Sequence, residues 1–220
     1  MKKEMVLSQV LWAAFCALAL VCIAVSLVVW FRPLYYWDLD YLKIPEHTGI
    51  PEILCRQNYD ALIDYNLLGG PSRLVLPDFS MSEGGRIHFE EVKVIFYFCQ
   101  VVALVGTATL IGKILWQLRR GKGDFRWLKW AGRGILLVIL LIGGLMAINW
   151  DLAFLLMHKL LFRNNLWIFD VRTDPIIKIL PDHFFLHCGI LILVLLFVLL
   201  FSCSLLAKYL NQRLTLEKKI

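Results

Sequence analysis

The sequence lacks the short motifs that carry the commonest enzyme chemistries. It contains no G-x-x-x-x-G-K-[ST] phosphate loop, no G-x-S-x-G nucleophile elbow and no H-E-x-x-H zinc motif. It also contains no C-x-x-C pair, and of its six cysteines only Cys55 lies clearly outside the long apolar runs. These absences exclude the familiar ATPase, serine-hydrolase and metalloprotease signatures, and they leave no basis for a disulfide framework.

Apolar sequence is what the chain has in abundance. It is 60% hydrophobic, with a mean hydropathy of +0.70, which is more apolar surface than a soluble domain can hide. Runs of about 18 or more apolar residues with few charges are typical of membrane-spanning helices. Four such runs are present, at residues 6–31, 92–116, 133–156 and 184–207.

Each run is long enough to cross about 30 Å of hydrocarbon at about 1.5 Å per residue. The first run is too long for the apolar centre of a signal peptide, which has roughly 7–15 residues, and no clean A-x-A site ends it. We therefore interpret it as a retained helix. The sequence predicts an all-α membrane protein in which residues 1–220 form a single membrane domain with four transmembrane helices.

The net charge of +6 is unevenly distributed. Basic residues gather between the second and third runs and at both ends of the chain: Lys113, Arg119, Arg120, Lys122, Arg126, Lys129, Arg133, Lys2, Lys3, Lys208, Arg213, Lys218 and Lys219. The positive-inside rule then predicts that both termini and the loop 117–132 are cytoplasmic, while segments 32–91 and 157–183 face outward. Topology and anionic lipid explain this charge, and no recognition motif accompanies it, so we expect no nucleic-acid partner.

The outward segment 32–91 is too long for a simple connector. Residues 32–47 are expected to be irregular chain along the membrane interface, and residues 51–70 an amphipathic helix ended by glycines. Residues 73–80 resemble a short edge strand interrupted by a proline. The two outward segments are therefore predicted to form a small mixed extracytoplasmic cap on the bundle.

Two histidines lie in polar surroundings beside apolar runs. A helix starting near His88 would place Glu91 on the same face, and a carboxylate can orient an imidazole and raise its basicity. His158 lies just after the third run and is followed by Asn164 and Asp170, groups able to support an oxyanion or brace a loop. For both histidines the plainer interpretation, a satisfied residue at the membrane interface, stays open.

His183 and His187 lie four residues apart at the start of the fourth run. That spacing can bind a metal, but two ligands do not make a zinc site, which needs three or four. Four-helix membrane cytochromes bury their haem ligands within the bundle, whereas these two histidines lie at one rim. We therefore predict no metal and no cofactor.

Two longer patterns add to these residues. Residues 79–93 carry F-S-x2-E-x4-H-x2-E-V-K, and residues 158–185 carry H-x3-F-x-N-x2-W-x-F-D-x3-D-x-I-x3-L-P-x2-F-F. Together they resemble a family of bacterial four-span membrane proteins that includes the lipoprotein intramolecular transacylase of low-GC Gram-positive bacteria. The resemblance covers essentially the whole chain, and the second pattern is the more specific.

This resemblance implies a substrate and a reaction. The substrates would be diacylglyceryl-modified lipoproteins, whose N-terminal cysteine has a free α-amine, together with membrane lipids. The sn-2 acyl chain would move to that amine, giving an N-acyl, S-monoacylglyceryl lipoprotein. The resemblance also implies a multi-pass protein of the bacterial cytoplasmic membrane, with its active site facing outward and no obligate protein partner. His88 and His158 match the expected catalytic centre, whereas the two histidines of the fourth run match no position of the patterns.

The reaction needs no catalytic serine or cysteine, because the substrate supplies its own nucleophile. We expect His158 as general base and His88 as acid or orienting partner with Glu91 behind it, although the sequence leaves the order of the histidines open. The remaining candidates are support and cleft residues. Lys93, Asn164 and Asp170 are candidates for oxyanion or loop support, and Tyr59, Tyr65 and Trp167 for the substrate cleft.

Two other classes of function remain open at this point. A different acyltransferase or lipid hydrolase of the outer leaflet would use the same histidines but release fatty acid or use another acceptor. A non-enzymatic membrane interaction protein would use the cap as a docking surface and would not depend on His88 or His158. A transporter is disfavoured, because the first, third and fourth runs show no acid, base or proline break at mid-membrane depth.

Overall fold

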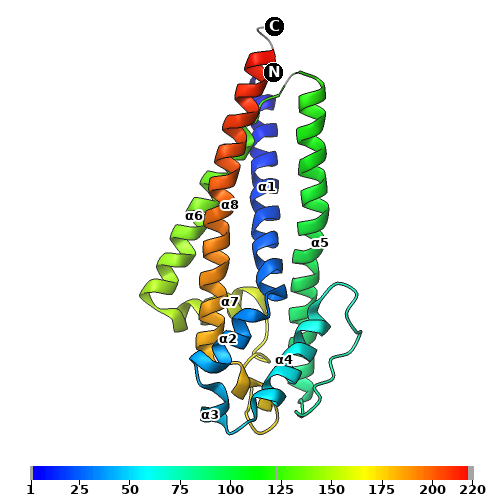
Figure 1. Ribbon diagram of the computed structural model, residues 1–220, viewed down its shortest axis with the longest axis vertical. Coiled ribbons are helices and arrows are strands. Elements are labelled where there is room, and N and C mark those ends of the chain that lie inside the picture. The colour runs from blue at the N-terminus through cyan, green and yellow to red at the C-terminus, as the bar shows by residue number, and fades with distance from the viewer. Residues whose placement is uncertain (1, 122, 218–220) are drawn as a thin grey trace. The chain divides into compact units, whose positions relative to one another are not determined.

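The computed structural model describes residues 2–121 and 123–217, with side chains from residue 6 to residue 215 (Figure 1). Some of the basic residues used for the topology prediction lie outside the described part of the chain. They are Lys122, Lys218 and Lys219, together with the side chains of Lys2 and Lys3. The elements are α1 (Lys2–Trp30), α2 (Pro33–Tyr41), α3 (Ile44–Thr48), α4 (Glu52–Asn66), α5 (Glu83–Arg119), α6 (Arg126–Ile148), α7 (Trp150–Leu161), the 3-10 helix η1 (Pro175–Ile179) and α8 (Asp182–Glu217).

Four of the helices are long and apolar enough to cross a membrane. They are Val6–Trp30 within α1, Glu83–Arg119, Arg126–Ile148 and Asp182–Thr215 within α8. The prediction of an all-α membrane protein with four transmembrane helices is confirmed. The helices extend beyond the apolar runs, because polar residues such as those at the start of α5 continue the helix outside the apolar stretch.

The third predicted run does not form one helix. α6 ends at Ile148, and Asn149 adopts an extended conformation with φ −157° and ψ 101°. The Asn149 side chain accepts a hydrogen bond from the backbone N–H of Leu152 at 2.9 Å, which makes it the N-cap of α7. The expected single helix over 133–156 is therefore wrong, because an asparagine inside an apolar run starts a second helix.

The cap segments, residues 32–91 and 157–183, also differ in part from expectation. α2 and α3 occupy the stretch predicted to be irregular, whereas the helix predicted over 51–70 is confirmed as α4. The short strand predicted over 73–80 is wrong, because the described residues there form turns and bends only. The apolar alternation that suggested a strand is real, since Leu74 and Leu76 are buried and Val75 is exposed.

Side chains rather than a β-ladder hold this segment in place. Asn58 in α4 donates to the carboxylate of Asp78 at 2.8 Å, and the backbone N–H of Asp78 donates to the Asn58 amide oxygen at 3.2 Å. A reciprocal side-chain pair of this kind satisfies polar groups that a strand would have satisfied through its neighbour. The cap is therefore helical with an irregular connector, and its mixed character was mispredicted.

The chain divides into two compact units, described here one at a time: the first comprises residues 1–25, 99–144 and 192–220, and the second residues 26–98 and 145–191. In the first unit, Phe125, Trp127 and Ile135 are fully buried among alanine and leucine side chains. A Cβ added to Gly106 would lie 2.9 Å from the Cβ of Ala19, so α5 and α1 approach closely there. The prediction of a single membrane domain remains untested.

The second unit is built around stacked aromatic rings. Tyr35 stacks on Tyr59 with ring centroids 3.8 Å apart and meets Phe184 edge-on at 5.2 Å. The Tyr35 hydroxyl donates to the backbone carbonyl of Ile179 at 3.0 Å, so the one polar group of this buried ring is satisfied. This core joins α2, α4, η1 and the start of α8, and the same unit contains His88 and His158.

Candidate functional site

The structure brings His88 and His158 together. His88 lies in the second turn of α5 and His158 near the end of α7, and both are buried, with 6% and 9% of their surface exposed. Their ring centroids are 6.2 Å apart. Phe162, the first residue after α7, contacts both rings, with centroid distances of 4.7 Å to His88 and 5.7 Å to His158. Two imidazoles 70 residues apart in the sequence therefore share one aromatic site.

A backbone carbonyl fixes the tautomer of His158. Its Nδ1 lies 2.9 Å from the carbonyl oxygen of Phe154, one helical turn earlier. Because a carbonyl oxygen only accepts, Nδ1 donates the hydrogen, and the neutral ring keeps its lone pair on Nε2. Burial lowers the pKa of His158, and the hydrogen bond to Phe154 only partly opposes this. The ring is thus neutral at pH 7 and can take up a proton at Nε2.

His88 lies in an apolar enclosure. The rings of Phe162 and Phe169 meet it edge-on at 4.7 and 5.4 Å, and Phe89 lies 5.9 Å away. Its Nδ1 is buried and has no hydrogen-bond partner among the described residues. A buried polar atom without a partner is unusual and costs about 1–3 kcal/mol. Such an atom is suited to a hydrogen bond that forms only with a bound molecule.

Glu91 and Asn164 form the polar edge of the site. Asn164, in the segment after α7, donates from its amide nitrogen to one carboxylate oxygen of Glu91 at 2.8 Å. The Asn164 amide oxygen accepts from the backbone N–H of Leu166 at 3.0 Å. The amide is thus occupied on both sides, and its described role is to hold Glu91. A role for Glu91 behind His88 remains a prediction, because the Nδ1 of His88 is not bonded to it.

Lys93 is engaged within the cap. Its ammonium group donates to the backbone carbonyl of Pro71 and lies over the ring of Tyr65 at 4.0 Å and that of Tyr97 at 5.5 Å. These contacts fasten the irregular connector to α5. Lys93 and Tyr65 therefore contact each other as part of the cap structure. Neither histidine is among the described partners of Lys93.

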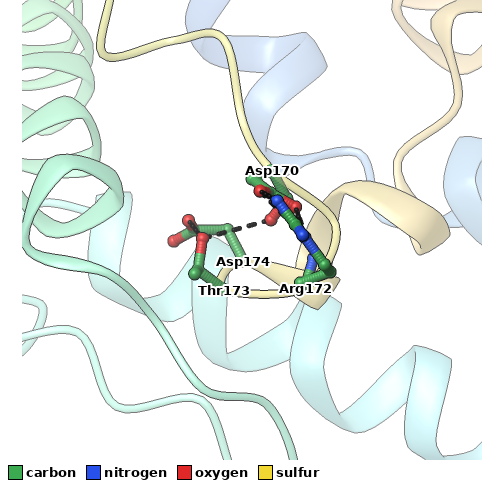
Figure 2. A network of polar contacts seen from close by, with 4 residues as sticks. All are labelled: Asp170, Arg172, Thr173 and Asp174. Carbon is green, nitrogen blue, oxygen red and sulfur yellow. Dashed lines mark hydrogen bonds and ion pairs between the residues drawn. The ribbon is translucent and has the colours of Figure 1, made fainter.

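Asp170 braces a turn rather than contacting a histidine. Figure 2 shows its carboxylate against Arg172, whose Nε lies 3.1 Å and Nη2 2.6 Å from it. The pKa of Asp170 is lowered by these hydrogen bonds from Arg172. Its backbone carbonyl accepts the N–H groups of Thr173 and Asp174 at 3.0 and 2.8 Å. The turn so formed presents Asp174 to the start of α5.

Asp174 is a buried residue beside α5 that was not among the predicted site residues. It is 2% exposed, and its carboxylate accepts from the Thr173 hydroxyl at 2.7 Å and from the backbone N–H of Ser82 at 2.8 Å. A Cβ on Gly85 would lie 2.2 Å from this carboxylate, so only glycine fits there. Asp174 therefore fixes the first turn of α5, one turn before His88, and its place within the second pattern was the only signal available in the sequence.

Of the three predicted cleft residues, one contacts a histidine. Trp167 stacks on His158 with centroids 4.6 Å apart and an angle of 30° between the planes. Its indole Nε1 is buried and has no hydrogen-bond partner within the described chain. Tyr59 belongs to the aromatic core of the second unit, where burial raises the pKa of its hydroxyl. Trp167 is thus the one of the three that is in described contact with a histidine of the candidate site.

The two histidines of α8 lie elsewhere in the second unit. His187 Nδ1 is 2.7 Å from a carboxylate oxygen of the fully buried Asp38. His183 lines a cavity of about 280 Å³ together with His47 and Lys178. Within residues 2–121 and 123–217, no group of three or more His, Cys, Asp or Glu side chains is arranged to hold a metal.

Comparison with known proteins identifies a family to which the chain is similar. A family model described as lipoprotein intramolecular transacylase Lit matches residues 10–185, a range that contains His88 and His158. No curated protein matches the chain. The solved structures that match are of the membrane-integral lipoprotein intramolecular transacylase Lit from Bacillus cereus.

One of these structures is 30% identical to this chain, covers 97% of it and 98% of the other chain, and superposes with a TM-score of 0.88. Two others carry a single histidine substitution. The histidine-to-arginine structure is 31% identical, covers 98% of this chain and 96% of the other, and has a TM-score of 0.81. The histidine-to-alanine structure is 30% identical over 96% of each chain, with a TM-score of 0.80.

Proposed function

Because this chain belongs to the lipoprotein intramolecular transacylase family, and is therefore a multi-pass membrane acyltransferase, we propose the following reaction for it. The sn-2 acyl chain of an S-diacylglyceryl cysteine moves to the α-amine of the same cysteine. The product is an N-acyl, S-monoacylglyceryl lipoprotein. The observation that carries this proposal is the buried pair of His88 and His158, in which the Nε2 of His158 is left free to accept a proton.

The first step forms the carbon–nitrogen bond. The α-amine attacks the carbonyl carbon of the sn-2 ester, and its proton passes to Nε2 of His158. An α-amine has a pKa of about 7.7–8.0, so an imidazole of slightly lower pKa can assist its deprotonation. Amine and ester belong to one molecule, and holding them together contributes several kcal/mol through proximity alone.

The second step breaks the carbon–oxygen bond. The tetrahedral intermediate collapses to an amide, and the sn-2 oxygen leaves as an alkoxide that takes up a proton. That proton is the one held at Nε2 of His158, and His88 is placed to relay or orient it, because its buried ring lies 6.2 Å from His158 and its Nδ1 has no described partner. Each atom is then accounted for: one amide and one hydroxyl form from one amine and one ester.

Exclusion of water supports acyl transfer over hydrolysis. The imidazoles are enclosed by the rings of Phe154, Phe162, Phe169 and Trp167, all within 5.7 Å of one histidine or the other. An apolar enclosure keeps water from competing with the amine for the ester. It also offers an apolar lining to the acyl chain that moves.

The orientation in the membrane is part of the proposal. Both termini and the loop 117–132 lie on the cytoplasmic side, and the histidine site faces outward, where a processed lipoprotein presents its amine. The excess of Lys and Arg in that loop and near the termini supports this orientation. The substrates are accordingly diacylglyceryl-modified lipoproteins of a bacterial cytoplasmic membrane.

Mass spectrometry of N-terminal lipopeptides tests the reaction. The host is a bacterium without its own lipoprotein N-acyltransferase, with this protein, without it, or with His158→Ala. Substrate and product are isomers, so fragmentation must place the acyl chain on nitrogen or on glycerol. Amine acylation that the variant loses supports the proposal. Peptides that keep a free amine, with or without release of fatty acid, would overturn it.

A further inference from the structure

The N-terminal part of α5 carries three acidic side chains with different partners. Glu83 and Glu90 are exposed, and both form ion pairs with Arg86. Glu91 has no ion pair among the described residues, although it lies on the same helix one residue further on. One of its carboxylate oxygens accepts from Asn164, and the other, Oε2, is buried without any described hydrogen-bond partner.

A buried carboxylate oxygen without a partner is costly. Burial removes water from the charged group, and only a cation or further hydrogen-bond donors offset that loss. Proteins tolerate such a group chiefly where a bound molecule completes it. Asn164 holds the carboxylate in place through its own oxygen, which accepts the N–H of Leu166 at 3.0 Å, so Glu91 is oriented but incompletely satisfied.

Glu91 lies close in the chain to His88, and its partner Asn164 lies in the segment that follows His158. Glu91 follows His88 by three residues on α5, which places the two side chains on one face of the helix. Its partner Asn164 lies between Phe162, which contacts both imidazoles, and Trp167, which stacks on His158. The carboxylate of Glu91 is thus held by the same segment that supplies two of the aromatic rings around the histidines.

We propose that the Glu91 carboxylate binds the α-ammonium group of the lipoprotein and thereby selects substrates whose N-terminal amine is free. This inference rests on the proposed function and names a specificity-determining residue for it. An α-ammonium group is a cation with three N–H donors, so one donation to Oε2 of Glu91 leaves two donors for other acceptors, among them Nε2 of His158. It supplies the cation and the donor that Glu91 lacks in the structure.

The same contact distinguishes substrate from product. After acyl transfer the nitrogen is a neutral amide with one N–H, which binds a carboxylate more weakly than an ammonium group does. Glu91 therefore favours the unmodified lipoprotein and releases the N-acylated one. A lipoprotein that already carries an N-terminal amide is excluded by the same reasoning.

Equilibrium binding of non-transferable ligands tests this inference. The probe is a cysteinyl peptide with an S-dialkylglyceryl ether in place of the ester, prepared with a free amine, with an N-acetyl group and with an α-hydroxyl in place of the amine. The full-length protein in detergent is expected to bind the amine form about 10- to 100-fold more tightly than the other two, the range given by a hydrogen bond to a charged group.

Glu91→Gln and Glu90→Gln form the matched pair of variants. Glu91→Gln keeps the oxygen that accepts from Asn164 and removes the charge, so the preference for the amine should fall to within about twofold. Glu90→Gln, on the exposed side, should keep it. A full preference in Glu91→Gln would overturn the inference. Equal binding of the three ligands by the wild-type protein would overturn it without any variant, should Glu91→Gln fail to fold.

Because the ether ligands cannot transfer an acyl chain, these results are independent of the reaction itself. Loss of amine preference with transfer intact would reject only the role of Glu91. Amine preference without transfer in the lipopeptide experiment would reject the proposed reaction and retain the binding role.

Discussion

The second unit contains two histidine pairs, Asp38 with His187 and His88 with His158, and they differ in the hydrogen-bond partners of the imidazole nitrogens. At Asp38 and His187, carboxylate and imidazole bond directly at 2.7 Å, and the aromatic rings of Trp37 and Tyr41 lie 5.7 Å from the histidine. At His88 and His158 no carboxylate contacts Nδ1 of either ring: one Nδ1 bonds a backbone carbonyl and the other has no described partner. An imidazole bound to its own carboxylate ties helices together, whereas one that is only oriented stays available to a substrate.

Removal of the proposed base should have the largest effect on activity. His158→Ala should lower kcat by about 10²- to 10⁴-fold, because a positioned general base contributes that much. The rate of amide formation in purified protein, read by fragment-ion mass spectrometry, measures the loss. His183→Ala, which removes an exposed histidine outside the site, is the control and should change the rate less than twofold. Comparable rates in the two variants would remove the distinction.

Removing the carboxylate of Asp38, which pairs with His187, should lower the stability of the protein and not its activity. Asp38 is fully buried, and burial raises its pKa while the hydrogen bond from His187 opposes the rise. Asp38→Ala leaves the His187 nitrogen without its acceptor and should cost about 1–3 kcal/mol. Thermal unfolding in detergent measures this, with the exposed Asp40→Ala on the same helix as control. A large loss of kcat in the folded fraction would show that Asp38 also serves the chemistry.

A substitution at Trp167 should have a smaller effect on activity and tests whether its indole N–H takes part in the reaction. Trp167→Phe keeps a ring against His158 and removes only the buried N–H. If that N–H donates to the ester oxygen as charge develops, kcat should fall about 2- to 12-fold, corresponding to a net hydrogen bond of about 0.5–1.5 kcal/mol. Trp150→Phe is a matched control, because its Nε1 is likewise buried without a described partner but its ring contacts Phe154 rather than a histidine. Equal effects of the two substitutions would assign Trp167 to packing alone.

The smallest effect concerns pH. Burial lowers the pKa of His158, so the neutral, basic form persists below the ordinary value of about 6.5 and is lost only as the pH falls through the lower folded value. Between pH 7 and pH 6.5 the rate at saturating substrate should therefore change by less than twofold, with the decline at more acidic pH. A half-maximal rate at pH 6.5 or above would contradict this protonation state.

The sequence predicts some of these features and not others for identifiable reasons. The four spans follow from composition, and His88 and His158 follow from their patterns. The break at Asn149 depends on one capping hydrogen bond within an apolar run, which hydropathy does not detect. Asp174 bonds Ser82 across 92 residues, and Asp38 bonds His187 across 149, so neither partnership has a local signal. The engagement of Lys93 with Pro71 and Tyr65 depends equally on tertiary contacts.

The N-cap of α7 at Asn149 also affects how the chain tolerates the insertion or deletion of a residue. In a continuous helix, one added residue rotates everything after it by about 100°, because a turn holds about 3.6 residues. Here the extended conformation of Asn149 ends one helix and its side chain starts the next, so the helical phase of α7 is counted from Asn149. A residue gained or lost within α6 is therefore not carried into α7 as a rotation of about 100°, as it would be in one continuous helix. The helical phase of the segment that carries His158 is thus set at Asn149 and not by the number of residues in α6.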